Sequence, residues 1–186
     1  MKREKFIVIV SHCILNTCSK VVYRGEETIT KEEKNREKFL KEILERKMHI
    51  IQLPCPEFEM YGGKRWGHSK EQFDNVFFRE KSKRLLEPVL QQIKEYMSMD
   101  QIKILGIVGV DGSPSCGIHS SFSADWGGEI SSIPNLEETL RGFRYRSEMG
   151  VFMEVFSEML EKENIHLPMF SLSDHTMEEM TYEDQA

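Results

Sequence analysis

The sequence lacks several features that would assign it to a familiar class. Four cysteines in 186 residues are fewer than a disulfide-built scaffold usually carries. The apolar run at residues 6–10 is too short for a membrane span or the core of a signal peptide. Acidic residues outnumber basic ones by 31 to 25, and a net charge of −6 disfavours general binding to nucleic acid. We therefore expect a cytoplasmic protein with reduced thiols and with neither a membrane nor a nucleic acid as its partner.

What the sequence does contain is typical of a globular protein. Hydrophobic residues make up 39% and charged residues 30% of the chain. The length favours a single domain over residues 1–186. We expect the acidic tail from about residue 177 to be frayed, and we find no internal repeat and no linker.

Strand and helix patterns alternate along the chain. The apolar runs are continuous rather than alternating, which favours strands covered on both faces and hence a parallel sheet. The helix from Thr30 begins with a capping-box pattern, and Pro88 predicts a kink or break in the next helix. The expected strands are 6–10, 49–53, 102–110 and 169–172, and the expected helices follow Thr30 and span 77–96 and 149–161. This order predicts a Rossmann-like, three-layer α/β/α fold with a mostly parallel central sheet.

Three of the cysteines follow predicted strands. Cys13, Cys55 and Cys116 each lie just past the carboxyl end of a strand, the edge of an open α/β sheet where ligands bind. A single cysteine is most often a small buried hydrophobic residue. These three, however, have equivalent positions and are flanked by proline, glycine and serine. We therefore expect the three cysteines to converge on one centre. Two long segments, 55–73 and 111–146, show no periodic pattern, and loops this long are usually functional or mobile.

Three neighbouring thiolates need a metal ion or a cluster to offset their negative charge. Zinc would take a fourth ligand, for which His12, His119 or Cys18 is available. An iron–sulfur cluster is the other option for soft sulfur ligands. The residue types alone leave both possibilities open.

Short motifs around these cysteines resemble a known family. The motifs are Ser11-x-Cys13-x-Leu15-Asn16 with Val22-Tyr23-Arg24-Gly25, Cys55-Pro56-Glu57, and Ser113-Pro114-Ser115-Cys116-Gly117. Together, in this order and at the ends of successive strands, they resemble the TudS-like desulfidases, relatives of thiouracil desulfidase. The resemblance spans residues 5 to about 117. It departs from the family pattern after Glu57, where the segment 60–67 replaces a segment expected to border the substrate pocket.

The resemblance implies a cofactor and a reaction. It implies a 4Fe–4S cluster held by Cys13, Cys55 and Cys116, with one iron left free to take the sulfur of a small thiolated substrate. The net reaction replaces C=S by C=O in a compound such as a thionucleobase, with water and without a redox partner.

Several neighbouring side chains are candidates for supporting roles. Glu57 is close enough to a ligand to act as a general acid or base, although a helix-start carboxylate is the ordinary interpretation. Ser113 and Ser115 could orient water or bond to the cluster, but serine and proline also favour plain turns. Ser11 has a similar status, as a low-ranked substrate contact. Arg65 and Trp66 could bind and stack on a planar base, or could form an exposed lid.

Two other functional classes stay open at this point. One is a non-catalytic protein in which zinc or a cluster joins three strand ends. The other is a metal-free sulfur carrier that uses a cysteine persulfide, for which Cys18 beside Cys13 would be the natural partner. A nucleotide-binding module is disfavoured, because the glycines between 105 and 117 match neither a Walker loop nor a dinucleotide fingerprint. Among these the desulfidase is our leading hypothesis.

Overall fold

Four parallel strands form the central sheet of the protein. A computed structural model describes residues 4–22, 26–125, 127–173 and 175–183. The strand order is β2-β1-β3-β6, and each neighbouring pair is parallel. The strands are β1 (Lys5–Val10), β2 (His49–Gln52), β3 (Ile102–Gly109) and β6 (Met169–Ser171). Their positions match the continuous apolar runs, so the sheet prediction is confirmed.

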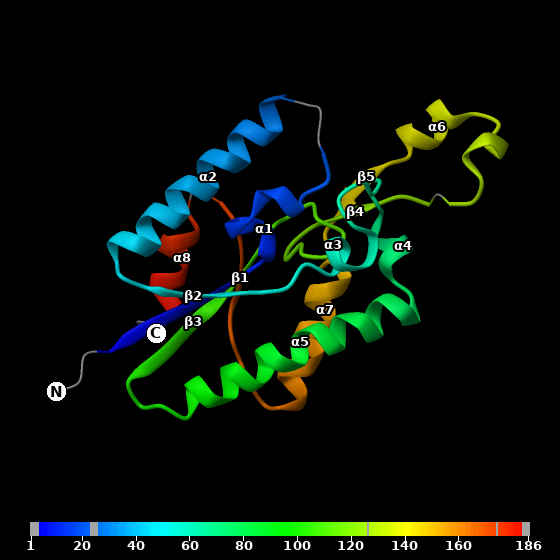
Figure 1. Ribbon diagram of the computed structural model, residues 1–186. Coiled ribbons are helices and arrows are strands. Elements are labelled where there is room, and N and C mark those ends of the chain that lie inside the picture. The colour runs from blue at the N-terminus through cyan, green and yellow to red at the C-terminus, as the bar shows by residue number, and fades with distance from the viewer. Residues whose placement is uncertain (1–3, 23–25, 126, 174, 184–186) are drawn as a thin grey trace.

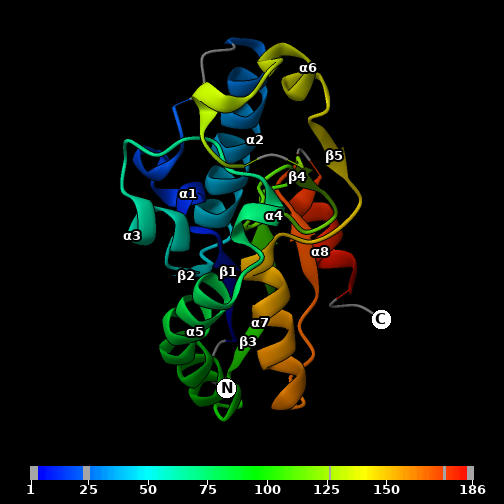
Figure 2. The same ribbon diagram turned by 90° about the vertical axis from the view of Figure 1, so that its right-hand side faces the viewer.

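Two helical layers cover the sheet, as the three-layer prediction requires (Figures 1 and 2). The covering helices are α2 (Glu26–Glu45) and α8 (Thr176–Glu183) on one face, and α5 (Val76–Met97) and α7 (Val151–Lys162) on the other. A hydrophobic core lies on each face of the sheet, and alternate residues of β1 belong to one core or the other. Ile7 and Ile9 pack with the residues of α5 and α7, while Val8 and Val10 pack with those of α2 and α8.

The helices refine the expected boundaries. α2 begins at Glu26, before the expected start at Thr30. α5 continues through Pro88 without a break, and its buried residues Leu86 and Leu90 pack in the core. Part of the acidic tail forms α8, in which Met177 and Met180 are buried in the other core.

Short elements fill the two segments without a periodic pattern. They gather beyond the carboxyl ends of the strands, opposite the amino terminus (Figure 1). The first segment holds α3 (Pro56–Tyr61) and α4 (Lys70–Phe73). The second holds β4 (Ser121–Ser123), η2 (Ile130–Ser132), α6 (Leu136–Arg141) and β5 (Arg144–Arg146), with β4 and β5 antiparallel. After β1 come α1 (His12–Leu15) and η1 (Thr17–Ser19).

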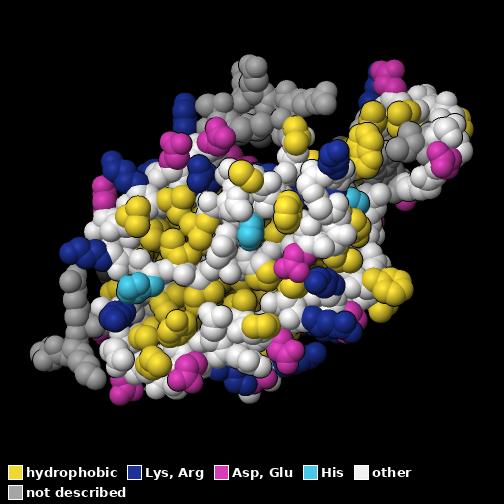
Figure 3. Space-filling model, viewed as in Figure 1, with side chains coloured by type: hydrophobic (Ala, Val, Ile, Leu, Met, Phe, Trp, Pro, Cys, Tyr) yellow, Lys and Arg dark blue, Asp and Glu magenta, His cyan; other side chains and the backbone are white. Residues whose placement is uncertain are grey.

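The outer strand β2 brings the hydrophobic core close to the surface. In the orientation of Figure 1, β2 runs across the front between α2 and α5. Figure 3 shows hydrophobic side chains gathered over the middle of this face, with charged side chains around them. No helix within the described ranges is long and apolar enough to span a bilayer.

Candidate functional site

Three of the four cysteines lie in neighbouring loops. Cys13 lies in α1 after β1, Cys55 caps the start of α3 after β2, and Cys116 lies in the loop after β3. We call these three the strand-end cysteines. Because β1 lies between β2 and β3, parallel pairing sets their loops side by side. All four cysteines are free, and Cys18, in η1, is exposed.

The strand-end cysteines share a poorly solvated environment in which their charges interact. Loss of water around Cys13 raises the pKa of its thiol to about 12, and nearby Cys55 and Glu57 oppose its ionisation further. Burial is the main cause that raises the pKa of the Cys116 thiol well above its usual range, and the neighbouring Cys13 raises it further. Burial also raises the pKa of the Cys55 thiol, and the Phe58 N–H, which donates to Cys55 Sγ at 3.4 Å, partly offsets this rise. Burial therefore disfavours the thiolate form of all three cysteines, and a nearby positive group would favour it.

Glu57 and two serines form a hydrogen-bond network beside Cys116. Ser115 Oγ donates to Glu57 Oε1 at 2.5 Å and lies 3.4 Å from Cys116 Sγ. Ser113 Oγ accepts the N–H of Cys116 at 3.0 Å and lies 3.2 Å from Ser115 Oγ. Glu57 and Ser115 are buried. The structure thus brings together the three residues that the sequence marked as catalytic candidates.

Asp111, which the sequence analysis did not single out, shapes the loop around Cys116. Its Oδ1 accepts the N–H groups of Ile118, His119 and Ser120 at 2.9, 2.8 and 3.3 Å. The available signal was the Asp-Gly pair directly after the third strand, which is typical of a tight turn.

The start of α7 supports the same loop from the other side. The N–H groups of Val151 and Phe152 donate to the carbonyls of Pro114 and Ser115, each at 3.0 Å. Gly150 permits this approach, since a Cβ there would lie 2.4 Å from the carbonyl carbon of Ser115. The loop is therefore fixed before any ligand binds.

Arg65 is held by hydrogen bonds to groups of the protein itself. Its side chain is 3% exposed. The guanidinium donates to Glu57 Oε2 at 3.1 Å and to the carbonyls of Gly62 and Ser19 at 3.1 and 2.6 Å. In the structure Arg65 thus contacts Glu57 and the backbone, and its contact with a substrate stays a prediction. Trp66 is 75% exposed and lines a hollow of about 130 Å³ with His68 and Ile133.

Ser11 provides a separate sign that the site accommodates another group. It lies between β1 and α1 as the N-cap of α1, is fully buried, and its Oγ has no hydrogen-bond partner among the described residues. A buried hydroxyl without a partner is costly, and a group bound at Cys13 could relieve that cost. Of the motif 22–25, residues 23–25 lie outside the described part of the chain.

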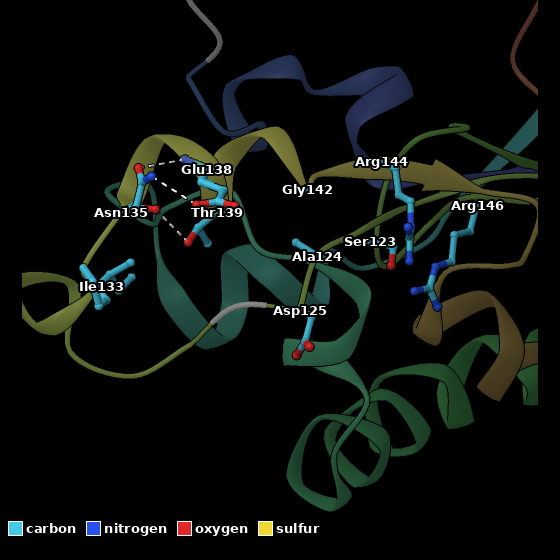
Figure 4. A pocket seen from close by; sticks show the side chains of 11 residues that line it. Ser123, Ala124, Asp125, Ile133, Asn135, Glu138, Thr139, Gly142, Arg144 and Arg146 are labelled. Atoms are coloured by element: carbon cyan, nitrogen blue, oxygen red, sulfur yellow. Dashed lines mark hydrogen bonds between the residues drawn. The ribbon is translucent and has the colours of Figure 1, made fainter.

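A larger pocket of about 450 Å³ lies beside β4, β5 and α6. Figure 4 shows Arg144 and Arg146 on one side and Asn135 and Glu138 on the other, so both charge signs line it. The segment 121–149 that carries it starts and ends at the Cys116 loop. There the Gly112 N–H donates to Ser120 O at 3.0 Å, and the Gly150 N–H to Gly117 O at 2.9 Å.

The donor set is informative about the kind of group that would fit. Within the described ranges, no three His, Cys, Asp or Glu side chains are arranged to hold one metal ion. Cysteines that bind a 4Fe–4S cluster each bond a different iron, so they stand farther apart than the ligands of one ion. Three soft, poorly solvated sulfur atoms beside an unpartnered Ser11 hydroxyl suit such a cluster.

Comparison with known proteins identifies the family. Residues 5–134 match the family described as "Putative 2-thiouracil desulfurase". The chain belongs to this family. An uncharacterized protein of Methanocaldococcus jannaschii is 38% identical over 116 residues, which cover 62% of this chain and 70% of that protein. No solved structure matches.

The match to the 2-thiouracil desulfurase family includes only part of the region described above. It contains the strand-end cysteines, Glu57 and the two serines of the network. It ends before α6 and β5, which supply much of the larger pocket. The shared part is therefore the cysteine centre, and one wall of the pocket lies outside it.

Proposed function

We propose that this protein is a desulfidase that removes sulfur from a small thiolated compound, such as a thionucleobase. In the balanced reaction, C=S and water give C=O and hydrogen sulfide, and no electrons are exchanged. Membership of the 2-thiouracil desulfurase family supports this reaction class. The observation that carries the proposal is the meeting of the strand-end cysteines with Glu57 and Ser115 at one edge of the sheet.

We further propose that Cys13, Cys55 and Cys116 hold a 4Fe–4S cluster. Bound through three cysteines, such a cluster supplies an iron with an open position that can take the sulfur of the substrate. Because burial opposes the thiolate form of these cysteines, their sulfurs could bind as thiolates only with a positively charged partner, which a metal-containing group would supply.

In this proposal Glu57 handles the proton of the attacking water. Its Oε1 accepts from Ser115 and its Oε2 from Arg65, and each carboxylate oxygen keeps a further lone pair. Glu57 therefore takes a proton from water as the oxygen bonds to carbon, and returns it as sulfur leaves. Ser115 lies between Glu57 and Cys116 and fixes the carboxylate against the cysteine centre.

We propose the two hollows as the place where the substrate body binds; their linings do not include the strand-end cysteines, Glu57 or Ser115. Ile133 lines both, so they adjoin one another. The exposed face of Trp66 offers a stacking surface for a planar heterocycle. The larger pocket offers polar side chains for the exocyclic groups of the substrate.

The test begins with protein purified without oxygen. We expect about four iron and four acid-labile sulfide per chain, with the broad visible absorbance of a cluster. Thiouracil should then lose its thiocarbonyl absorbance while an equal amount of sulfide appears. Zinc without sulfide would favour the structural metal protein. A metal-free chain with a persulfide on Cys18 would favour the sulfur carrier.

A further inference from the structure

Arg65 makes contacts that join two parts of the cysteine centre. It lies in the connection between α3 and α4, after the second strand-end cysteine. One of its hydrogen bonds, at 2.6 Å, goes to the carbonyl of Ser19 in η1, which belongs to the loop of Cys13. Another, at 3.1 Å, goes to the carboxylate of Glu57. A single buried side chain therefore connects the loops that follow β1 and β2.

Glu57 extends this connection to the third loop. Its other oxygen accepts the hydroxyl of Ser115 at 2.5 Å, directly beside Cys116. A continuous polar chain thus runs from Ser19 through Arg65 and Glu57 to Ser115. It crosses all three loops that carry a strand-end cysteine, and its members are held by hydrogen bonds within the protein.

The chemistry of the guanidinium explains why an arginine fits this position. Its planar fork has five N–H donors, and here they reach three acceptors that lie in different directions. A lysine could pair with Glu57 but could not reach both carbonyls in this way. Without any cation, the buried Glu57 carboxylate would lose its charged partner.

The connection that carries Arg65 is itself anchored by aromatic stacking. The rings of Tyr61, His68 and Phe73 pack against one another as a cluster: the His68 centroid lies 4.7 Å from Tyr61 and 4.9 Å from Phe73, and those two lie 5.8 Å apart. Phe73 in turn stacks on Phe78 at 4.5 Å. The backbone on the far side of Arg65 is therefore fixed to the core.

We propose that Arg65 is a positioning residue that holds the three cysteine-bearing loops together and orients Glu57, without touching the substrate. This inference rests on the proposed function for its kinetic part only. Its structural part concerns the metal-free chain and can be tested there.

The structural test compares Arg65→Gln with Arg79→Gln as a matched control. Arg79 is also an ion-paired arginine, bonded to Asp74, Glu154 and Glu158 away from the cysteines. The reduced, metal-free proteins are alkylated with iodoacetamide, and each cysteine is followed by mass spectrometry. We expect Arg65→Gln to speed alkylation of the strand-end cysteines about tenfold, with the exposed Cys18 unchanged as an internal reference.

Arg65→Lys keeps the charge and serves if Arg65→Gln does not fold. It should give intermediate rates, because it retains only the pairing with Glu57. Unchanged rates in both Arg65 variants, or an equal increase in Arg79→Gln, would overturn the inference.

The kinetic test uses cluster-loaded protein and thiouracil. We expect Arg65→Gln to lower kcat by about tenfold or more, with KM within about threefold of the wild-type value and partial rescue by Arg65→Lys. A raised KM with unchanged kcat would mean that Arg65 binds substrate, which would overturn the positioning role. If the wild-type chain has neither iron nor turnover, the proposed function fails, and the alkylation rates alone decide the role of Arg65.

Discussion

Glu57→Gln is a sharp test of the site, because an amide cannot replace this carboxylate. Glu57 accepts two hydrogen bonds from opposite sides, from Ser115 at 2.5 Å and from Arg65 at 3.1 Å. Glutamine has the same shape but carries only one acceptor oxygen. If its oxygen faces Ser115, its NH₂ group meets the Arg65 N–H, so two donors oppose one another. If it is turned the other way, Arg65 is satisfied and the Ser115 hydroxyl must change its partner.

The size of the effect follows from these contacts. Both groups are nearly buried, with 3% of the Arg65 and 10% of the Glu57 side chain exposed. Losing a charged hydrogen bond in such a place costs about 2–3 kcal/mol. For a chain of this size, that corresponds to a fall in Tm of about 5–10 °C. Loss of a general acid or base lowers turnover by about 10²–10⁴-fold.

Three measurements separate these effects. Urea unfolding of the metal-free chain gives the free energy of unfolding, iron analysis gives cluster content, and sulfide release from thiouracil gives turnover. We expect lower stability and near-normal iron content, with turnover almost abolished. Turnover within about twofold of wild type in a folded, iron-loaded variant would remove Glu57 from the mechanism.

Three further predictions concern the centre and its supports. Replacing any strand-end cysteine by serine should abolish iron binding while Cys18→Ser keeps most of it, and equal loss from all four would contradict the three-ligand centre. Lys70 is buried between Glu148 and Glu154, so Lys70→Met should lower the free energy of unfolding, measured in urea, by about 2–3 kcal/mol. Lys83 is an exposed ion-paired lysine, and Lys83→Met should change the free energy of unfolding by less than about 0.5 kcal/mol. Burial would raise the pKa of Glu71, but hydrogen bonds from Ser123 and Ala124 lower it to about 2. The charged Glu71 carboxylate therefore stabilises the fold above about pH 4.5, and this stabilisation is lost as the pH falls towards 2. Wild type and Glu71→Gln should differ in free energy of unfolding by about 1 kcal/mol at neutral pH, a small value because Glu71 is partly exposed, and the difference should disappear towards pH 2. A difference that does not change with pH would contradict this.

The sheet and the cysteine positions could be predicted because their signals are local and strong. Runs such as Ile7 to Val10 are β-branched and continuous, and parallel strands place their carboxyl ends together. The cysteines after those strands therefore had to lie at one edge. The sequence also predicted that Glu57, Ser113 and Ser115 lie near the cysteines, because each is within three residues of a strand-end cysteine.

Other features depend on contacts that no local pattern reveals. α3 has only six residues, too few for a recognisable periodicity, and its proline sits in the first helical turn. β4 and β5 have three residues each, and their pairing is long-range. Arg65 bonds to Ser19, which lies 46 positions away, so its structural role could not be read from its glycine-rich surroundings.

The segment 121–149 is closed at its base, because both of its ends are bonded to the loop of Cys116. Because both ends of the segment lie close together, the loop-closure entropy depends only weakly on the length of the segment, and residues can be added or removed there at little cost. The cysteine centre and the strand ends would keep their arrangement during such a change. If the proposed function holds, replacing this segment would change the pocket that it lines while leaving the cysteine centre in place, which offers a direct way to test what sets substrate choice.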